Sequence, residues 1–148
     1  METRPFGKTG ESFPILSFGG QRIVDTHGCT EEAAIEIVNT AIDRGIRYFD
    51  TAISYSYADS QAIIGEALKD VRDNVFITTK VDLWDLSKPD GRFTKAPRGE
   101  ATRQVEMNLK ELQSDYIDAI LIHGTPGVEQ MTVEQSMEVQ EELVIARD

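Results

Sequence analysis

Short apolar runs alternate with helix-like stretches along this chain, and successive runs end roughly 30 to 40 residues apart, the length of one strand–helix unit. Their ends fall near four residues: Gly19, Asp50, Lys80 and His123. The runs are apolar throughout instead of alternating with polar residues, as is typical of parallel strands covered by helices. The pattern therefore predicts an α/β fold in which four strands and four helices alternate, with right-handed crossovers between parallel strands.

The three later strands and one long loop follow from the local composition. Strands are predicted over residues 46–49, 75–79 and 116–122, which end directly before Asp50, Lys80 and His123. The segment from Val81 to Pro97 holds two prolines, one glycine and scattered charges. It is expected to be a long loop, and loops of this length in compact domains are usually functional or lid-like.

The first two helices are indicated by apolar residues on one face and by residues that begin or end helices. The first is expected to run from a cap at Thr30 to a stop at Gly45, and the second to be capped by Asp59 or Ser60. The residues expected to be buried recur at helical spacing: Ala34, Ile37, Val38, Ala41 and Ile42 in the first helix, and Ile63, Ile64, Ala67 and Leu68 in the second.

The last two helices are predicted in the same way. The fourth is expected to begin at Thr132, with Gln135 completing a capping box, and to run to Arg147. The buried face of the third is expected to consist of four residues at helical spacing: Ala101, Val105, Leu109 and Leu112.

The charge balance and the cysteine content restrict the partners and the setting. The chain carries 26 acidic and 15 basic side chains, a formal net charge of −11, and has no cluster of lysine and arginine. Neither a nucleic acid nor an anionic membrane is therefore expected as a partner. Cys29 is the single cysteine, and His27, Cys29 and His123 lack the spacing of a zinc site, so no metal is expected. We expect a soluble protein of the reducing cytoplasm.

Polar residues interrupt the apolar pattern at equivalent places, where the predicted strands end. Asp50, Lys80 and His123 each close a strand, and Tyr55 follows Asp50 by five residues in a polar loop. Taken singly, these are an ordinary turn residue, a solvated strand end, a half-buried histidine and a packing tyrosine. Because the carboxyl ends of parallel strands meet at one rim, where α/β barrels carry their chemistry, we interpret the four together as a candidate catalytic site.

The four groups suit the reduction of a carbonyl by hydride transfer, which builds negative charge on oxygen and needs a proton donor. Tyr55 is the expected donor, because an ammonium such as that of Lys80 strengthens a phenol as an acid. Asp50 would hold Lys80 in place, and His123 would donate a hydrogen bond to the substrate oxygen. We expect the Tyr55 hydroxyl, the Lys80 ammonium and the Asp50 carboxylate to lie within hydrogen-bonding reach.

The chain resembles the aldo-keto reductase family over nearly its whole length, and the matching motifs occur in the family's order. The motif formed by Asp50, Thr51, Ala52 and Tyr55 is specific, whereas the glycine motifs would be weak on their own. The matching strings are Phe6-Gly7-Lys8-Thr9-Gly10, Phe18-Gly19-Gly20, Tyr48-Phe49-Asp50-Thr51-Ala52 with Tyr55, Gly65-Glu66-Ala67-Leu68, Thr79-Lys80, and Asp115-Tyr116-Ile117-Asp118 before Ile122-His123.

The resemblance implies a (β/α)8 barrel of the TIM type. Only the first four strand–helix units are expected here, since the chain is well short of the about 250 residues of a full barrel. They would follow an N-terminal hairpin, over roughly residues 3–6 and 12–14, that plugs the bottom of the barrel. Residues 1–148 would thus form the N-terminal half of one barrel domain, with no further domain.

The resemblance also implies a cofactor and a site. The cofactor would be NADPH, with NADH as an alternative, reducing a small carbonyl substrate without a G-x-G-x-x-G turn, a motif that this sequence does not contain. The catalytic residues would be Asp50, Tyr55, Lys80 and His123. The cofactor would be contacted by Gly20, Gln21 and Asp50.

Two alternatives stay open from the sequence. One is a non-catalytic half-barrel, present as a truncated form or as a self-associating interaction fragment. The other is an unrelated doubly wound binding domain, which leaves the ordered motif matches unexplained. A half-barrel would expose strand edges and the inner face of its sheet, so either a second copy of the chain or a missing C-terminal half is expected as its partner.

Overall fold

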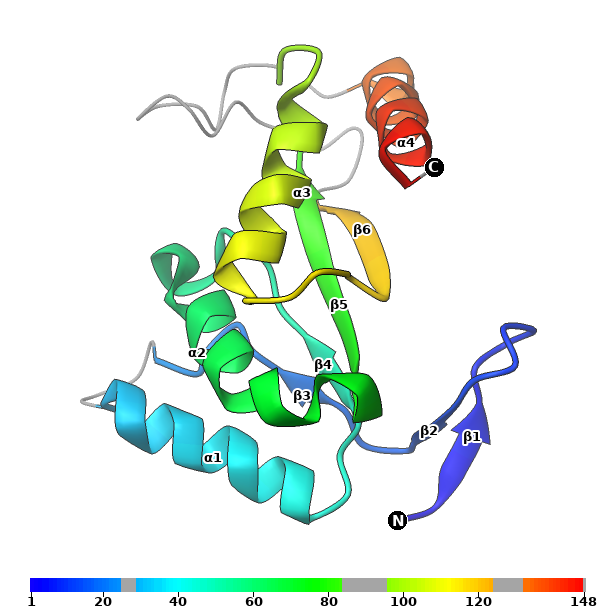
Figure 1. The fold of residues 1–148 in the computed structure, drawn as a ribbon. Coiled ribbons are helices and arrows are strands. Elements are labelled where there is room, and N and C mark those ends of the chain that lie inside the picture. The colour runs from blue at the N-terminus through cyan, green and yellow to red at the C-terminus, as the bar shows by residue number, and fades with distance from the viewer. Residues whose placement is uncertain (25–28, 84–95, 124–131, 148) are drawn as a thin grey trace.

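A computed structural model describes residues 1–24, 29–83, 96–123 and 132–147 and shows an α/β fold built on a four-stranded parallel sheet (Figure 1). The sheet has the order β3-β4-β5-β6, so neighbouring strands follow one another along the chain as they do in a barrel. This confirms the predicted fold class and strand order. The strands are β3 (Phe18–Gly19), β4 (Tyr48–Asp50), β5 (Phe76–Asp82) and β6 (Ala119–His123).

Helices connect the strands, and local sequence signals set where they begin. They are α1 (Glu31–Asp43), α2 (Asp59–Leu68), α3 (Glu100–Glu111) and α4 (Val133–Arg147), with 3₁₀ turns η1 (Tyr55–Ala58) and η2 (Lys69–Asn74) on either side of α2. The Thr30 hydroxyl accepts a hydrogen bond from the Ala33 N–H, and Thr132 and Gln135 form the predicted capping box. Within the described residues, no helix has the length and apolarity needed to cross a membrane.

The helices cover one face of the sheet and bury its apolar core there. Phe49 and Ile77, from neighbouring strands, pack with α1 and α2, and Ile64 and Leu112 complete the largest cluster. Gly65 allows this close packing, because a Cβ at that position would lie 2.6 Å from the Leu112 backbone carbonyl. Strand residues alternate between the faces, so the polar side chains of the candidate site lie on the opposite, inner face.

The hairpin implied by the resemblance is present. It consists of antiparallel β1 (Thr3–Pro5) and β2 (Ser12–Pro14), and Figure 1 shows it beside the amino-terminal ends of β4 and β5. Its aromatic rings pack against the inner face at that end: Phe13 lies 4.8 Å from Phe76 and 5.2 Å from Tyr48 between ring centroids. The hairpin therefore closes the end of the sheet opposite to the candidate site.

Strand β5 is longer than predicted. The sequence placed its end before Lys80 and a loop from Val81, whereas the strand continues to Asp82; of the expected loop, residues 84–95 lie outside the described part. Its extra residues have no β4 partner, because β4 ends at Asp50. Amide side chains of α3 take that place: Asn108 donates to the Lys80 carbonyl at 3.0 Å, and Gln104 accepts from the Asp82 N–H at 2.6 Å and donates to its carbonyl at 3.1 Å.

The same amides explain why the predicted buried face of α3 is partly wrong. Ala101 and Leu112 are buried as expected, but Gln104 and Asn108 are fully buried, while Val105 and Leu109 are only half-buried. Apolar periodicity does not register polar side chains that are buried to bind a strand backbone.

The start of β6 also differs from the prediction. The strand begins at Ala119 instead of Tyr116. The residues before it are bound by Arg72 instead of pairing with β5: Arg72 donates to the Tyr116 carbonyl at 3.1 Å and to the Asp118 carboxylate at 2.7 Å. Asp118 in turn accepts from the Ile77 N–H at 2.8 Å. A side-chain carboxylate thus replaces the backbone carbonyl that a neighbouring strand would supply at this point.

A carboxylate of α4 caps the amino-terminal end of α3. The N-cap residue of α3 is Gly99, which offers no side chain, and Glu142 accepts from the Gly99 N–H at 3.1 Å and from the Thr102 N–H at 2.9 Å. Burial alone would raise the pKa of the Glu142 carboxyl, but the hydrogen bonds from Thr102 and Gly99 together hold this pKa below its usual value of 4.5. The ionised carboxylate thus fastens α4 to α3.

This contact predicts a pH dependence of stability. A carboxyl whose pKa is lowered by folding stabilises the protein above its ordinary pKa, and this contribution is lost as the pH falls through the lowered value. We expect Glu142→Gln to reduce the free energy of unfolding by about 1 kcal/mol at pH 7, the usual effect of losing a cap, and by less below about pH 4.

Urea unfolding from pH 7 to pH 3 measures this dependence, with Glu141→Gln as the control on an exposed position of the same helix. A difference between Glu142→Gln and the unmodified chain that stays constant with pH would contradict the proposed role of the carboxylate.

Candidate active site

The carboxyl ends of β4, β5 and β6 bring polar residues together on the inner face of the sheet. Asp50 is the last residue of β4 and His123 the last residue of β6, as predicted. Lys80 lies two residues before the end of β5 and not at its end, because the strand is longer than expected. In the register of the sheet Lys80 faces Leu121, and Asp82 faces His123.

Lys80 is held in one position by two oxygen atoms of the neighbouring segment. Its Nζ donates to Asp50 Oδ1 at 2.6 Å and to the Thr51 carbonyl at 2.8 Å, and the residue is 8% exposed. A buried ammonium is costly unless it is paired and hydrogen-bonded, and both conditions are met here. The structure therefore brings Lys80 and Asp50 together in a fixed ion pair.

Tyr55 lies beside this pair, but in a different orientation from the expected one. It begins η1, immediately after the loop that follows β4. The Lys80 ammonium lies 4.7 Å from the centre of the Tyr55 ring, over its face. Within the described residues the Tyr55 hydroxyl forms no hydrogen bond with Lys80, so the structure brings the ring and not the hydroxyl into contact with the ammonium.

His123 completes the group from the third strand. Its ring lies 5.5 Å from that of Tyr55 in an edge-to-face arrangement. Its Nδ1 is 3.1 Å from Asp82 Oδ1 and 3.3 Å from Ser54 Oγ. Sequence analysis missed Asp82 because it fell in the predicted loop; extending the predicted strand from Thr79 to Asp82 would have placed it on the same face as Lys80.

The end of β3 lies next to Asp50. The Gly20 N–H donates to the Asp50 carbonyl at 2.8 Å, and the Gly20 carbonyl accepts from Ser60 Oγ at 2.9 Å. A Cβ on Gly20 would lie 2.7 Å from both Ile64 Cδ1 and Ser60 Oγ, which explains the glycine. Gln21 is exposed, and its carbonyl accepts from Ser56 Oγ at 3.3 Å. The predicted cofactor residues Gly20 and Gln21 thus lie beside the predicted catalytic ones.

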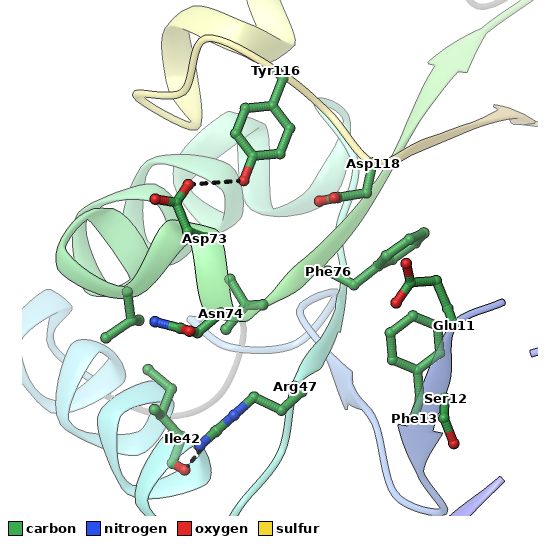
Figure 2. Close-up of a pocket in the computed structure, with 12 residues that line it drawn as sticks. Glu11, Ser12, Phe13, Ile42, Arg47, Asp73, Asn74, Phe76, Tyr116 and Asp118 are labelled. Carbon is green, nitrogen blue, oxygen red and sulfur yellow. Dashed lines mark hydrogen bonds between the residues drawn. The ribbon is translucent and has the colours of Figure 1, made fainter. Parts of the chain in front are cut away.

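A separate hollow of about 520 Å³ lies at the opposite end of the strands. Figure 2 shows residues of the hairpin, such as Phe13, on one side of it and Asp73 and Tyr116 on the other. Arg47 lines the hollow and donates to the Ile42 carbonyl at 2.8 Å. The Tyr116 hydroxyl, on the other side, lies 3.3 Å from Asp73 Oδ1. None of the four predicted catalytic residues lines this hollow.

Comparison with known proteins identifies the family. A family model described as the aldo/keto reductase family matches residues 15–145, nearly the whole chain. The chain belongs to the aldo-keto reductase family. Among its curated relatives, Aldo-keto reductase YhdN of Bacillus subtilis (strain 168) is 37% identical in an alignment 148 positions long, which covers 97% of this chain and 43% of YhdN.

Solved structures agree with this assignment. The holo form of aldo-keto reductase AKR11C1 from Bacillus halodurans superposes with a TM-score of 0.77 at 28% identity, covering 97% of this chain and 46% of that one. An aldo-keto reductase from Klebsiella pneumoniae in complex with NADPH shares the fold, with a TM-score of 0.68 at 24% identity, over 92% of this chain and 43% of that one. The chain thus spans about half the length of its relatives and forms a partial (β/α)8 barrel.

Proposed function

We propose that this chain supplies the catalytic side chains of an NADPH-dependent reductase that converts small aldehydes or ketones to alcohols. The observation that carries the proposal is the Lys80 ammonium, fixed by Asp50 and lying over the Tyr55 ring, with the His123 ring 5.5 Å from the Tyr55 ring in an edge-to-face arrangement. Membership of the family supports an oxidoreductase that acts on carbonyls. The tetrad, the cofactor and the substrate are our proposals.

In the proposed reaction the nicotinamide, when bound, supplies a hydride to the carbonyl carbon. The Tyr55 hydroxyl gives its proton to the carbonyl oxygen, which becomes the alcohol. The Lys80 ammonium stabilises the phenolate left behind, and Asp50 keeps the ammonium in place. A hydrogen bond from the His123 ring would orient the carbonyl oxygen, the role expected from the sequence.

The residues at this end of the sheet fit a nicotinamide cofactor in one specific respect. The Asp50 side chain is 33% exposed although one of its oxygens binds Lys80, so acceptor positions remain for a hydroxyl group of the cofactor. Exposed Gln21 would make a second contact. Buried Gly20 would act indirectly, by letting the chain pass close to Ser60 and Ile64. NADPH is favoured over NADH because the Klebsiella pneumoniae relative was solved with NADPH.

The setting and the partners are part of the same proposal. A single cysteine and a net charge of −11 support a reducing cytoplasmic environment, with neither nucleic acid nor membrane as a partner. Strands β3 and β6 are the edges of the described sheet, and Leu121 on the inner face of β6 is 48% exposed. We propose that a second copy of the chain, or the C-terminal half of a barrel, covers it.

Two measurements test the proposal. The first is NADPH binding, followed by fluorescence, on the 148-residue chain and on a barrel completed with the C-terminal half of the Bacillus subtilis relative, together with the mass of each in solution. The second is consumption of NADPH by the completed barrel with a panel of small aldehydes and ketones. A completed barrel that folds and binds NADPH but reduces none of these compounds would overturn the proposed activity.

A further inference from the structure

Asp82 is an acidic residue held rigidly at the carboxyl end of β5. Its own N–H and carbonyl are both bound by the Gln104 side chain, at 2.6 Å and 3.1 Å, so its backbone is fixed in direction. The residue is only 7% exposed. A buried carboxylate is costly without a partner, so its presence at this position needs an explanation.

His123 is the partner that the register of the sheet provides. The two residues lie directly opposite each other on β5 and β6, and Asp82 Oδ1 is 3.1 Å from His123 Nδ1. Asp82 Oδ2 is buried and has no hydrogen-bond partner within the described residues. Within the described residues, the imidazole of His123 is therefore the side-chain partner of the Asp82 carboxylate.

The chemistry of the contact determines where the imidazole carries its proton. An ionised carboxylate only accepts hydrogen bonds, so Nδ1 must donate and Nε2 is left for the site. We propose that Asp82 is a positioning residue that keeps a proton on Nδ1 of His123 and directs Nε2 toward the substrate oxygen. The inference rests on the proposed function, because it concerns how His123 would act there.

The consequence is that the function of Nε2 depends on the protonation of the ring. In the neutral ring Nε2 accepts a hydrogen bond, as from an alcohol, and in the imidazolium it donates one, as to a carbonyl. The described groups that face the ring are Asp82 from β5, Ser54, and Tyr55 from η1, and the Lys80 ammonium lies 4.7 Å from the centre of the Tyr55 ring. Reduction would therefore use the imidazolium, and the reverse reaction the neutral ring.

The opposing possibility is that Ser54 controls the ring. Its hydroxyl lies 3.3 Å from the same Nδ1 and is able to donate as well as accept. If it donated, Nδ1 would carry no proton, and the neutral ring would be protonated on Nε2. The two arrangements thus predict opposite tautomers.

The tautomer is measured directly by ¹⁵N–¹H correlation spectra of the imidazole in the 148-residue chain, at a pH where the ring is neutral. The chain has two histidines, so a His27→Gln background leaves His123 as the only imidazole. We expect the neutral ring of His123 to be protonated on Nδ1. Protonation on Nε2 would overturn the inference, and because no turnover is involved, this result would leave the proposed carbonyl reduction standing.

Two variants in the same background sharpen the test. Asp82→Leu removes the carboxylate and keeps a side chain that branches at the γ carbon, and we expect the proton to move from Nδ1 mainly to Nε2. Ser54→Ala is the matched control, and we expect it to leave the proton on Nδ1. If Ser54→Ala moved the proton while Asp82→Leu left it in place, Ser54 and not Asp82 would be the positioning residue.

Discussion

Replacing Tyr55 with phenylalanine is expected to lower the rate of carbonyl reduction at least about 100-fold in a barrel completed with the C-terminal half of the Bacillus subtilis relative. The substitution removes the proposed proton donor and leaves the ring that lies under the Lys80 ammonium. The charge that develops on the substrate oxygen would then have no proton to neutralise it. The loss should therefore appear in kcat, with little change in the affinity for NADPH.

Steady-state rates and NADPH titrations of the variant measure both quantities. Tyr116→Phe serves as the control, since it removes a tyrosine hydroxyl at the opposite end of the sheet, beside Asp73. Turnover of Tyr55→Phe equal to that of the unmodified barrel would exclude Tyr55 as the donor. A variant that loses NADPH binding would instead assign Tyr55 to the cofactor site.

The second large effect is expected on stability, from Arg72→Ala. The Arg72 side chain is 11% exposed, pairs with Asp118 at 2.7 Å, donates to Ser114 Oγ at 2.9 Å, and lies 3.8 Å from the centre of the Tyr116 ring. Its removal leaves the Asp118 carboxylate, whose side chain is 19% exposed, without its cation. Because the substitution removes the ion pair, the hydrogen bonds to Ser114 and to the Tyr116 carbonyl and the contact with the Tyr116 ring together, we expect a loss of about 3 kcal/mol in the free energy of unfolding.

Urea unfolding of the 148-residue chain measures this loss, and two variants serve as references. Arg4→Ala removes a pair with Glu2 in which both side chains are more than half exposed, so it should cost less than about 0.5 kcal/mol. Arg72→Lys keeps the charge but not the planar fork, and should fall between the two. The role assigned to Arg72 would be wrong if its alanine variant were no less stable than Arg4→Ala.

The features that the sequence predicted correctly depend on short-range signals. Thr30 and the pair of Thr132 and Gln135 cap their helices through contacts three residues apart, which are visible in the sequence. The spacing of the apolar runs was enough for the parallel strand order, because each strand–helix unit returns the chain beside its predecessor. The proximity of Asp50 and Lys80 followed from the same rule.

The features that it missed depend on contacts between distant residues. Gln104 binds Asp82 across 22 residues, and Asn108 binds Lys80 across 28, both through polar side chains that periodicity assigns to solvent. Without those contacts, β5 appeared to end too early and Asp82 could not be placed. The orientation of Tyr55 was missed for a related reason, since it depends on the 3₁₀ turn η1 within what was expected to be a loop.

The amide side chains of α3 make the two ends of β5 respond differently to local motion. The amino-terminal end is held by backbone hydrogen bonds, such as that from the Phe76 N–H to the Arg47 carbonyl, and these do not depend on the position of α3. The carboxyl end depends, on its β4 side, on Gln104 and Asn108. A local unfolding that separates α3 from the sheet would therefore loosen the segment carrying Lys80 and Asp82 before the rest of the strand. The positions of these two reactive side chains thus depend on how tightly α3 packs on the sheet.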